Sequence, residues 1–148
     1  MAKEIERKFL VKGEFREFSV KETGITQAYL SVRPGMVVRL RISGNSAVFS
    51  IKAPVEKTEF TRHEWEFEIP GEMAREIMET CLPRRIIKTR YLVPFKGHTF
   101  EVDVFHGKNE GLIIAELELS DETEQFEKPE WLGEEVTGRP EYYNANLV

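Results

Sequence analysis

The chain has 148 residues, of which 41% are hydrophobic and 32% are charged, and its formal net charge is −5. The acidic balance disfavours duplex nucleic acid as a partner, because such binding needs a broad excess of Lys and Arg. No apolar run approaches the roughly 20 residues of a membrane span, and the charged opening residues are unlike a leader peptide. We therefore expect one domain over residues 1–148, cytoplasmic, that binds neither nucleic acid nor membrane.

The first predicted strand covers residues 3–11 and carries Glu4, Glu6 and Lys8 before an apolar run. Side chains alternate along a strand, so these three share one face and lie about 7 Å apart, from a rise of roughly 3.3 Å per residue. Two carboxylates and an ammonium in such a row can hold a divalent metal beside a phosphate. The alternative is a charged edge strand that opposes aggregation.

The rest of the chain alternates short apolar segments with turn residues, which is typical of an antiparallel barrel or sandwich. Residues 34–35, 44–46 and 96–98 have the composition of hairpin turns. Including the first strand, we expect strands at residues 3–11, 26–33, 36–43, 46–53, 59–69, 85–95, 99–106 and 112–119.

Two segments have helical patterns. Residues 71–81 repeat apolar side chains every four positions, and Pro83 would end that helix. Ser120 or Asp121 would cap a second short helix over residues 121–127. Helices are thus a minority, and we class the fold as mainly β with a few peripheral helices.

The polar faces of these strands hold almost only charged residues, and the signs separate by strand. Basic positions are Arg39, Arg41, Lys52, Lys88 and Arg90, whereas acidic pairs are Glu64 and Glu66, Glu101 and Asp103, and Glu116 and Glu118. If the sheet closes with this face inward, the lumen has a basic wall and an acidic wall. The alternative is an ordinary half-exposed sheet, which also alternates polar and apolar residues.

A charged lumen needs water, mutual pairing or a bound polyanion, because isolated buried charges are costly. Basic side chains would hold phosphate oxygens. Paired carboxylates would hold Mg²⁺ or Mn²⁺, which take oxygen ligands and share them with substrate phosphates. The apolar outer face must pack on helices or on a second subunit, so a homodimer is one of two alternatives.

With these features the chain resembles the CYTH family of triphosphate tunnel metalloenzymes. The family's Glu-x-Glu-x-Lys motif matches Glu4, Glu6 and Lys8. The match continues in family order through residues 27–30, 39–41, 50–52, 64–66, 88–91, 101–105, 116–118, 131–137 and 142–144. The resemblance implies a closed eight-stranded antiparallel β-barrel that forms a tunnel for triphosphate. The short length is similar to that of bacterial members that act as inorganic triphosphatases.

The resemblance also assigns roles to individual residues. Metal ligands would be Glu4, Glu6, Glu116 and Glu118, assisted by Asp103, Glu64, Glu66 and Glu101. Phosphate would be bound by Lys8, Arg39, Arg41, Lys52, Lys88 and Arg90, and we add Arg62, which shares a strand face with Glu64. Tyr142 and Asn144 match family positions, but their role stays open between contacting the ligand and plugging the tunnel.

We expect metal-dependent hydrolysis of inorganic triphosphate to diphosphate and phosphate. A second metal, Glu4 or Glu6 would orient and deprotonate the attacking water. The alternative base is Lys88 held by Tyr29, a dyad that resembles one in some short family members; it must be neutral to act, and the nearby Arg90 would lower its pKa.

Three other functions compete with this one. A nucleoside or thiamine triphosphatase, or a class IV-type adenylyl cyclase, would need a further pocket for a base or thiazolium ring. A non-catalytic polyphosphate-binding module would carry the same acidic and basic residues.

Overall fold

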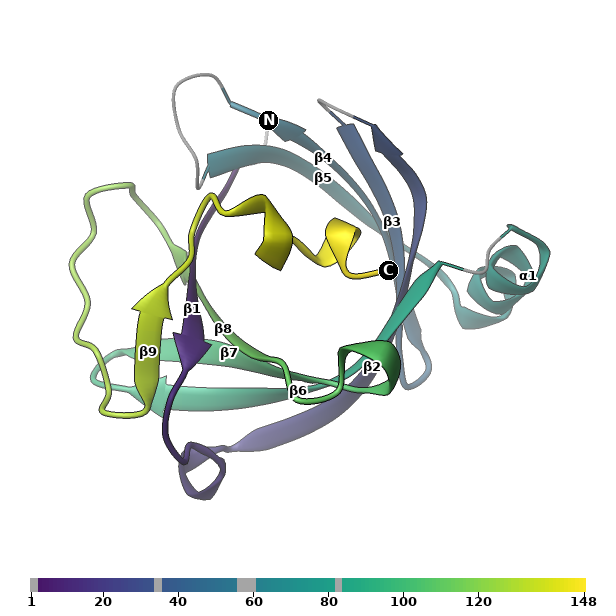
Figure 1. The fold of residues 1–148 in the computed structure, drawn as a ribbon. Coiled ribbons are helices and arrows are strands. Elements are labelled where there is room, and N and C mark those ends of the chain that lie inside the picture. Colours follow the sequence, from purple (N-terminus) through teal and green to yellow (C-terminus); the bar gives the residue numbers. More distant parts are fainter. Residues whose placement is uncertain (1–2, 34–35, 56–60, 82–83) are drawn as a thin grey trace.

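The computed structural model describes residues 3–33, 36–55, 61–81 and 84–148. Within these residues, nine strands form one antiparallel sheet that closes on itself (Figure 1). The strands are β1 (Lys3–Val11), β2 (Lys21–Arg33), β3 (Met36–Ser43), β4 (Ser46–Pro54), β5 (Thr61–Pro70), β6 (Arg85–Phe95), β7 (His98–Phe105), β8 (Ile113–Leu119) and β9 (Leu132–Glu135). The helix α1 (Gly71–Cys81) follows β5 and lies outside the ring of strands.

Strand β1 closes the barrel. The sheet order is β5-β4-β3-β2-β6-β7-β8-β1-β9, and β5 also pairs with β1. One edge of β1 pairs with β8 from Ile5 to Leu10. The first residues of β1 pair in addition with β5, and Phe9 and Val11 pair with β9. The predicted closed eight-stranded antiparallel barrel is confirmed, with β9 as one extra strand.

The outer face of the barrel carries most of the apolar core. One cluster packs Phe9, Phe100 and Leu117 under Phe15 and Trp131, which lie outside the strands. A second cluster packs α1 against β3 and β4. Apolar residues that alternate with charged ones in the sequence therefore point outward, as the period of two requires.

Cover of the outer face is incomplete beside α1. Trp65 and Phe67 on β5 remain 42% and 50% exposed, and the Phe67 ring stacks on Phe49 at 5.2 Å between ring centroids. A homodimer that would cover them stays a prediction. None of the helices in the described part of the chain is long and apolar enough to cross a membrane.

One end of the lumen is apolar and is filled by the C-terminal segment, residues 137–148. Tyr29, Phe105 and Ile114 form a buried cluster against which Tyr142 and Leu147 pack. This segment contains the short 3₁₀ turns η3 (Pro140–Tyr142) and η4 (Asn144–Asn146). In the view along the barrel it lies within the ring of strands (Figure 1). The other two 3₁₀ turns of the described chain are η1 (Arg16–Phe18) and η2 (Gly107–Asn109).

The predicted helix over residues 121–127 is wrong. Asp121 accepts hydrogen bonds from the backbone and the hydroxyl of Thr123, and Glu124 accepts from the backbone and hydroxyl of Ser120. These side-chain acceptors satisfy the local N–H groups without a helical ladder, which is how Asp and Ser favour turns over helices. The segment then runs as a loop that places Phe126 against Phe9.

Other differences concern strand ends. Strand β2 begins at Lys21, five residues earlier than predicted, because it pairs with β6 from Lys21 to Ala28. Strand β9 was not predicted. The turn at residues 96–97 is confirmed, with both residues at positive φ (46° and 87°), as tight hairpins require. Three predicted features lie outside the described residues: the turn at residues 34–35, the first two residues of the strand at 59–69, and the helix end at Pro83.

Candidate active site

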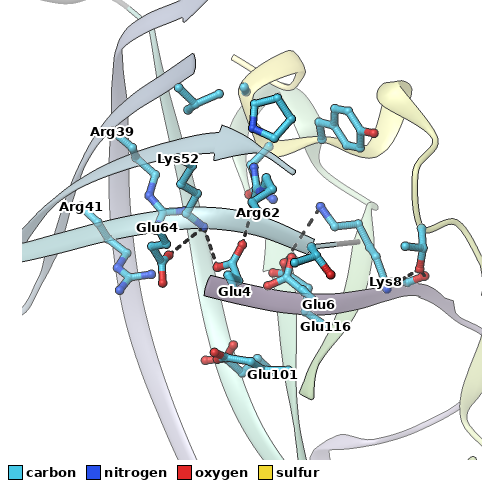
Figure 2. Close-up of a pocket in the computed structure, with 18 of the residues that line it drawn as sticks. Glu4, Glu6, Lys8, Arg39, Arg41, Lys52, Arg62, Glu64, Glu101 and Glu116 are labelled. Carbon is cyan, nitrogen blue, oxygen red and sulfur yellow. Dashed lines mark hydrogen bonds and ion pairs between the residues drawn. The ribbon is translucent and has the colours of Figure 1, made fainter. Parts of the chain in front are cut away.

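The lumen holds a cavity of about 610 Å³. It is lined by inward-facing side chains from all eight barrel strands and by the C-terminal segment, and Figure 2 labels part of this lining. Asp103 of β7 is buried and is not among the lining residues. Of the residues predicted from sequence, the cavity is lined by Glu4, Glu6, Lys8, Tyr29, Arg39, Arg41, Lys52, Arg62, Glu64, Glu66, Lys88, Arg90, Glu101, Glu116 and Glu118. Alternation along each strand thus brings together charges that are up to 114 residues apart in the sequence (Glu4 to Glu118).

Glu4 is the centre of one ion-paired group. Its carboxylate accepts hydrogen bonds from Lys52 Nζ and Arg62 Nη2, both at 2.8 Å, and Lys52 Nζ also lies 3.3 Å from Glu64 Oε2 (Figure 2). Burial acts to raise the pKa of Glu4, but Lys52 and Arg62 outweigh it and hold the pKa at about 2. Glu4 is therefore an ionised carboxylate that neutralises two of the predicted phosphate-binding cations.

Arg90 and Asp103 form a second ion-paired group. Arg90 donates to both oxygens of Asp103, at 2.7 Å from Nε and 2.9 Å from Nη2, and reaches Glu116 at 3.2 Å. Lys88 Nζ lies 2.7 Å from Asp103 Oδ2. Asp103 is fully buried, and its two oxygens contact the two cations beside it, Arg90 and Lys88.

The pKa of Lys88 is lowered to about 8. Burial is the largest cause; Asp103 opposes it, and the positive charge of Arg90 adds to it. A lysine with this pKa is partly neutral near physiological pH, which is the state a general base needs.

The acidic wall brings like charges face to face. In the register of β1 with β8, Glu6 lies opposite Glu118, and in that of β7 with β8, Glu101 lies opposite Glu116. Like charges directly across a sheet destabilise it. Burial, followed by Glu116 and Glu4, raises the pKa of Glu6 well above its usual value.

This acidic wall fits a divalent cation by its chemistry. Its carboxylate oxygens are the ligands that Mg²⁺ and Mn²⁺ prefer, and a bound cation would relieve the repulsion around Glu6. Within the described residues, no three Asp, Glu, His or Cys side chains already stand in a metal-binding arrangement. Glu4 and Glu116 are instead engaged with Lys and Arg side chains.

The opposite wall has basic side chains with unused hydrogen-bonding capacity. Arg39 is nearly buried, and its Nε has no hydrogen-bond partner among the described residues. The nearby Arg41 lies 3.9 Å from Glu66, and burial, Arg39 and Arg90 lower its pKa. Adjacent guanidinium groups that are this weakly neutralised form a site for an anion such as phosphate.

The predicted Tyr29–Lys88 dyad is linked through two amide side chains. Gln27 Nε2 donates to the Tyr29 hydroxyl at 2.8 Å and to Asn144 Oδ1 at 3.2 Å. Lys88 Nζ donates to the same Asn144 Oδ1 at 3.0 Å. Burial raises the pKa of Tyr29, so its hydroxyl stays protonated.

The C-terminal segment supplies lining residues to which no definite role was assigned from the sequence. Gly138, at a φ of 79°, turns the chain after β9, and Lys8 Nζ then donates to the Tyr142 carbonyl at 3.1 Å. The lining residues of this segment are Thr137, Gly138, Tyr143, Asn144 and Ala145. Short 3₁₀ turns have no apolar periodicity, so only the family positions of Tyr142 and Asn144 pointed to them.

Comparison with known proteins agrees with this geometry. The chain is 44% identical to an inorganic triphosphatase of Acetivibrio thermocellus, covering 100% of this chain and 94% of the relative. It is 33% identical to an inorganic triphosphatase of Nitrosomonas europaea, covering 98% of this chain and 96% of the relative. The crystal structure of the inorganic triphosphatase NE1496 has a TM-score of 0.66 at 33% identity, over 99% of this chain and 95% of that one. A CYTH domain model matches residues 2–146, and the chain therefore belongs to the CYTH domain family.

Proposed function

We propose that this protein hydrolyses inorganic triphosphate to diphosphate and phosphate inside the barrel, with Mg²⁺ or Mn²⁺ as cofactor. One observation carries the proposal: the weakly neutralised Arg39 and Arg41 and the repelling carboxylates around Glu6 line one cavity. An anion bound together with a divalent cation would neutralise the basic side chains and the repelling carboxylates at the same time. The names of the two relatives support inorganic triphosphate as this anion.

The basic side chains would hold the phosphate chain. Arg39 and Arg41 offer donors from β3, and Lys8 offers one from β1 beside the C-terminal segment. Lys52, Arg62 and Arg90 are paired with carboxylates, so they would be shared between those partners and the phosphates. Several positive charges around a triphosphate stabilise the charge that develops on its oxygens during transfer.

Glu6, Glu116 and Glu118 would hold the metal, with Glu4, Glu64 and Glu66 beside them. A bound divalent cation supplies charge neutralisation at the phosphates and lowers the pKa of a coordinated water. Sequence also suggested Asp103 as an assisting ligand. Because both its oxygens accept hydrogen bonds from Arg90 and Lys88, we assign it the role of holding these two cations in place.

Lys88 would act as the general base. It lines the cavity, and its pKa of about 8 makes the neutral amine accessible. The neutral amine takes a proton from water as the water oxygen bonds to the terminal phosphorus. The bond to the bridging oxygen breaks, and diphosphate leaves with the electron pair. The alternative base is the carboxylate of Glu4 or Glu6, and the pH dependence of the rate separates the two.

Phosphate release from inorganic triphosphate, ATP and thiamine triphosphate, each with Mg²⁺, Mn²⁺ or EDTA, tests the proposal. We expect metal-dependent release that is most efficient with inorganic triphosphate. More efficient cleavage of ATP or thiamine triphosphate would contradict the assigned substrate. Tight binding of triphosphate without turnover would favour a binding module, and formation of cyclic AMP from ATP would favour a cyclase.

A further inference from the structure

The C-terminal segment takes no part in the chemistry proposed above, although it lines the cavity. We propose that Asn144 in this segment is a positioning residue: its side-chain oxygen fixes the Lys88 amine and, through Gln27, the Tyr29 hydroxyl. The C-terminal segment would thereby complete the catalytic centre as well as fill one end of the barrel. This inference rests on the proposed function.

A single oxygen atom joins the three side chains. Asn144 Oδ1 accepts from Lys88 Nζ at 3.0 Å and from Gln27 Nε2 at 3.2 Å. The same Gln27 nitrogen donates to the Tyr29 hydroxyl at 2.8 Å. Lys88 and Tyr29 come from β6 and β2, whereas Asn144 enters from a separate segment that the two strands do not position.

Hydrogen-bond counting explains why Lys88 needs this acceptor. A neutral lysine amine has two N–H donors and one lone pair, and both Asp103 and Asn144 Oδ1 can only accept. With one N–H on each of them, only the lone pair remains available. Because Lys88 lines the cavity, that lone pair is left for a water molecule there. Without Asn144 the amine could turn, and its lone pair would lose its fixed direction.

Gln27 shows that this arrangement is specific. Its side chain is fully buried, does not line the cavity, and is held through Nε2, while its Oε1 has no partner among the described residues. Burying an amide oxygen without a partner is costly. The buried Gln27 is thus held by its bridge between Tyr29 and Asn144, which both line the cavity, although its own oxygen lacks a partner among the described residues.

The test uses variants of nearly equal shape. Asn144→Leu removes the acceptor, and Asn144→Asp keeps an oxygen in its place. Asn146→Leu is the matched control, because Asn146 lies in the same 3₁₀ turn and is exposed, and among the described residues its side chain donates only to the Pro140 carbonyl. For each protein, kcat for inorganic triphosphate is measured across pH with Mg²⁺, and the Kd for triphosphate is measured by calorimetry without added metal.

We expect Asn144→Leu to lower the highest kcat about tenfold, the upper end of the effect of losing one hydrogen bond between neutral groups. Its Kd should stay within about threefold of wild type, since the other basic side chains remain. Asn144→Asp should restore most of the lost kcat, and Asn146→Leu should leave both constants unchanged.

Two results would overturn the inference. A loss that appears wholly in Kd, with kcat retained, would make Asn144 a binding residue. Equal losses in the Asn144→Leu and Asn146→Leu variants would reduce its role to docking the segment. Absence of turnover in the wild type would instead refute the proposed function, which keeps the two failures distinct.

Discussion

The inner and outer faces of the barrel are built by the same strands but have opposite effects on stability. On β7, Phe100 and Val102 point outward into the main apolar cluster, whereas Glu101 and Asp103 point inward to Arg90. The outer face gains free energy from burying apolar surface. The inner face buries charges that repel or need partners, which costs stability and prepares a binding site. We therefore expect outer-face changes to alter stability and inner-face changes to alter activity.

The largest effect on activity is expected from Glu6→Gln. Losing this carboxylate from the acidic wall should weaken metal-assisted stabilisation of the transition state by several kcal/mol, a fall in kcat/KM of about 10³-fold. The free energy of unfolding should stay equal or rise, because a buried group that repels Glu116 and Glu4 is removed.

Phosphate release and urea unfolding measure the two quantities for Glu6→Gln. Glu68→Gln is the control, since Glu68 on β5 is exposed and outside the cavity lining. A Glu6→Gln protein that is less stable yet fully active would reverse the assignment of the two faces.

The matching outer-face change is Phe100→Ala. Phe100 is fully buried and packs edge-on to Trp131 at 5.4 Å between ring centroids. Its truncation should lower the free energy of unfolding by about 3–5 kcal/mol. The kcat of the folded fraction should be kept. Urea unfolding measures the loss, and Phe18→Ala is the control because Phe18 is exposed. Similar losses of stability in both variants would contradict the stabilising role of the apolar cluster on the outer face.

The pH profile sharpens the comparison within the lumen. If neutral Lys88 is the base, kcat rises about tenfold per pH unit below its pKa and levels off above it, and that pKa is about 8. The rate rises with pH because the fraction of Lys88 in the neutral form increases as the pH passes its lowered pKa. A rate profile from about pH 6 to 10 measures this.

Lys88→Arg, which stays charged in this range, should lose the rising limb together with most of the activity. A wild-type profile that is flat over the whole interval would move the base to a carboxylate.

The smallest effect is expected from Arg7→Ala. Arg7 faces outward and donates to both oxygens of Glu135 on β9, at 2.7 and 2.6 Å. Losing this partly exposed pair should cost about 1 kcal/mol of stability or less, with kcat unchanged. Thermal unfolding measures it beside Arg16→Ala, whose partner Glu14 is exposed. A marked loss of activity in Arg7→Ala would mean that β9 also orders the lumen.

Sequence predicted the two faces well because a period of two is a local property. Alternation alone places Glu4, Glu6 and Lys8 on one face of their strand, and likewise Arg39 and Arg41. The expectation that these faces line a tunnel came from the family resemblance, and in the structure all five residues line the cavity. The helix over residues 71–81 could be predicted for the same reason, since its period is visible in one segment.

Sequence could not predict which charges pair. Glu4 is neutralised by Arg62 because β1 pairs with β5 at the point where the barrel closes, and that register joins distant segments. The C-terminal route into the lumen was also hidden, because it depends on a turn at Gly138 and on 3₁₀ turns without periodicity. Segment 121–127 was predicted as a helix because a capping residue looks the same in a turn.

The central claim is that the lumen binds triphosphate and a divalent cation on opposite walls. Crystals grown with Mn²⁺ and triphosphate, measured for the anomalous signal of manganese, test it most directly. We predict a manganese peak among Glu6, Glu116 and Glu118, with phosphate density against Arg39 and Arg41. Phosphate density outside the barrel, or a lumen that binds triphosphate with no manganese near the Glu6 wall, would contradict it.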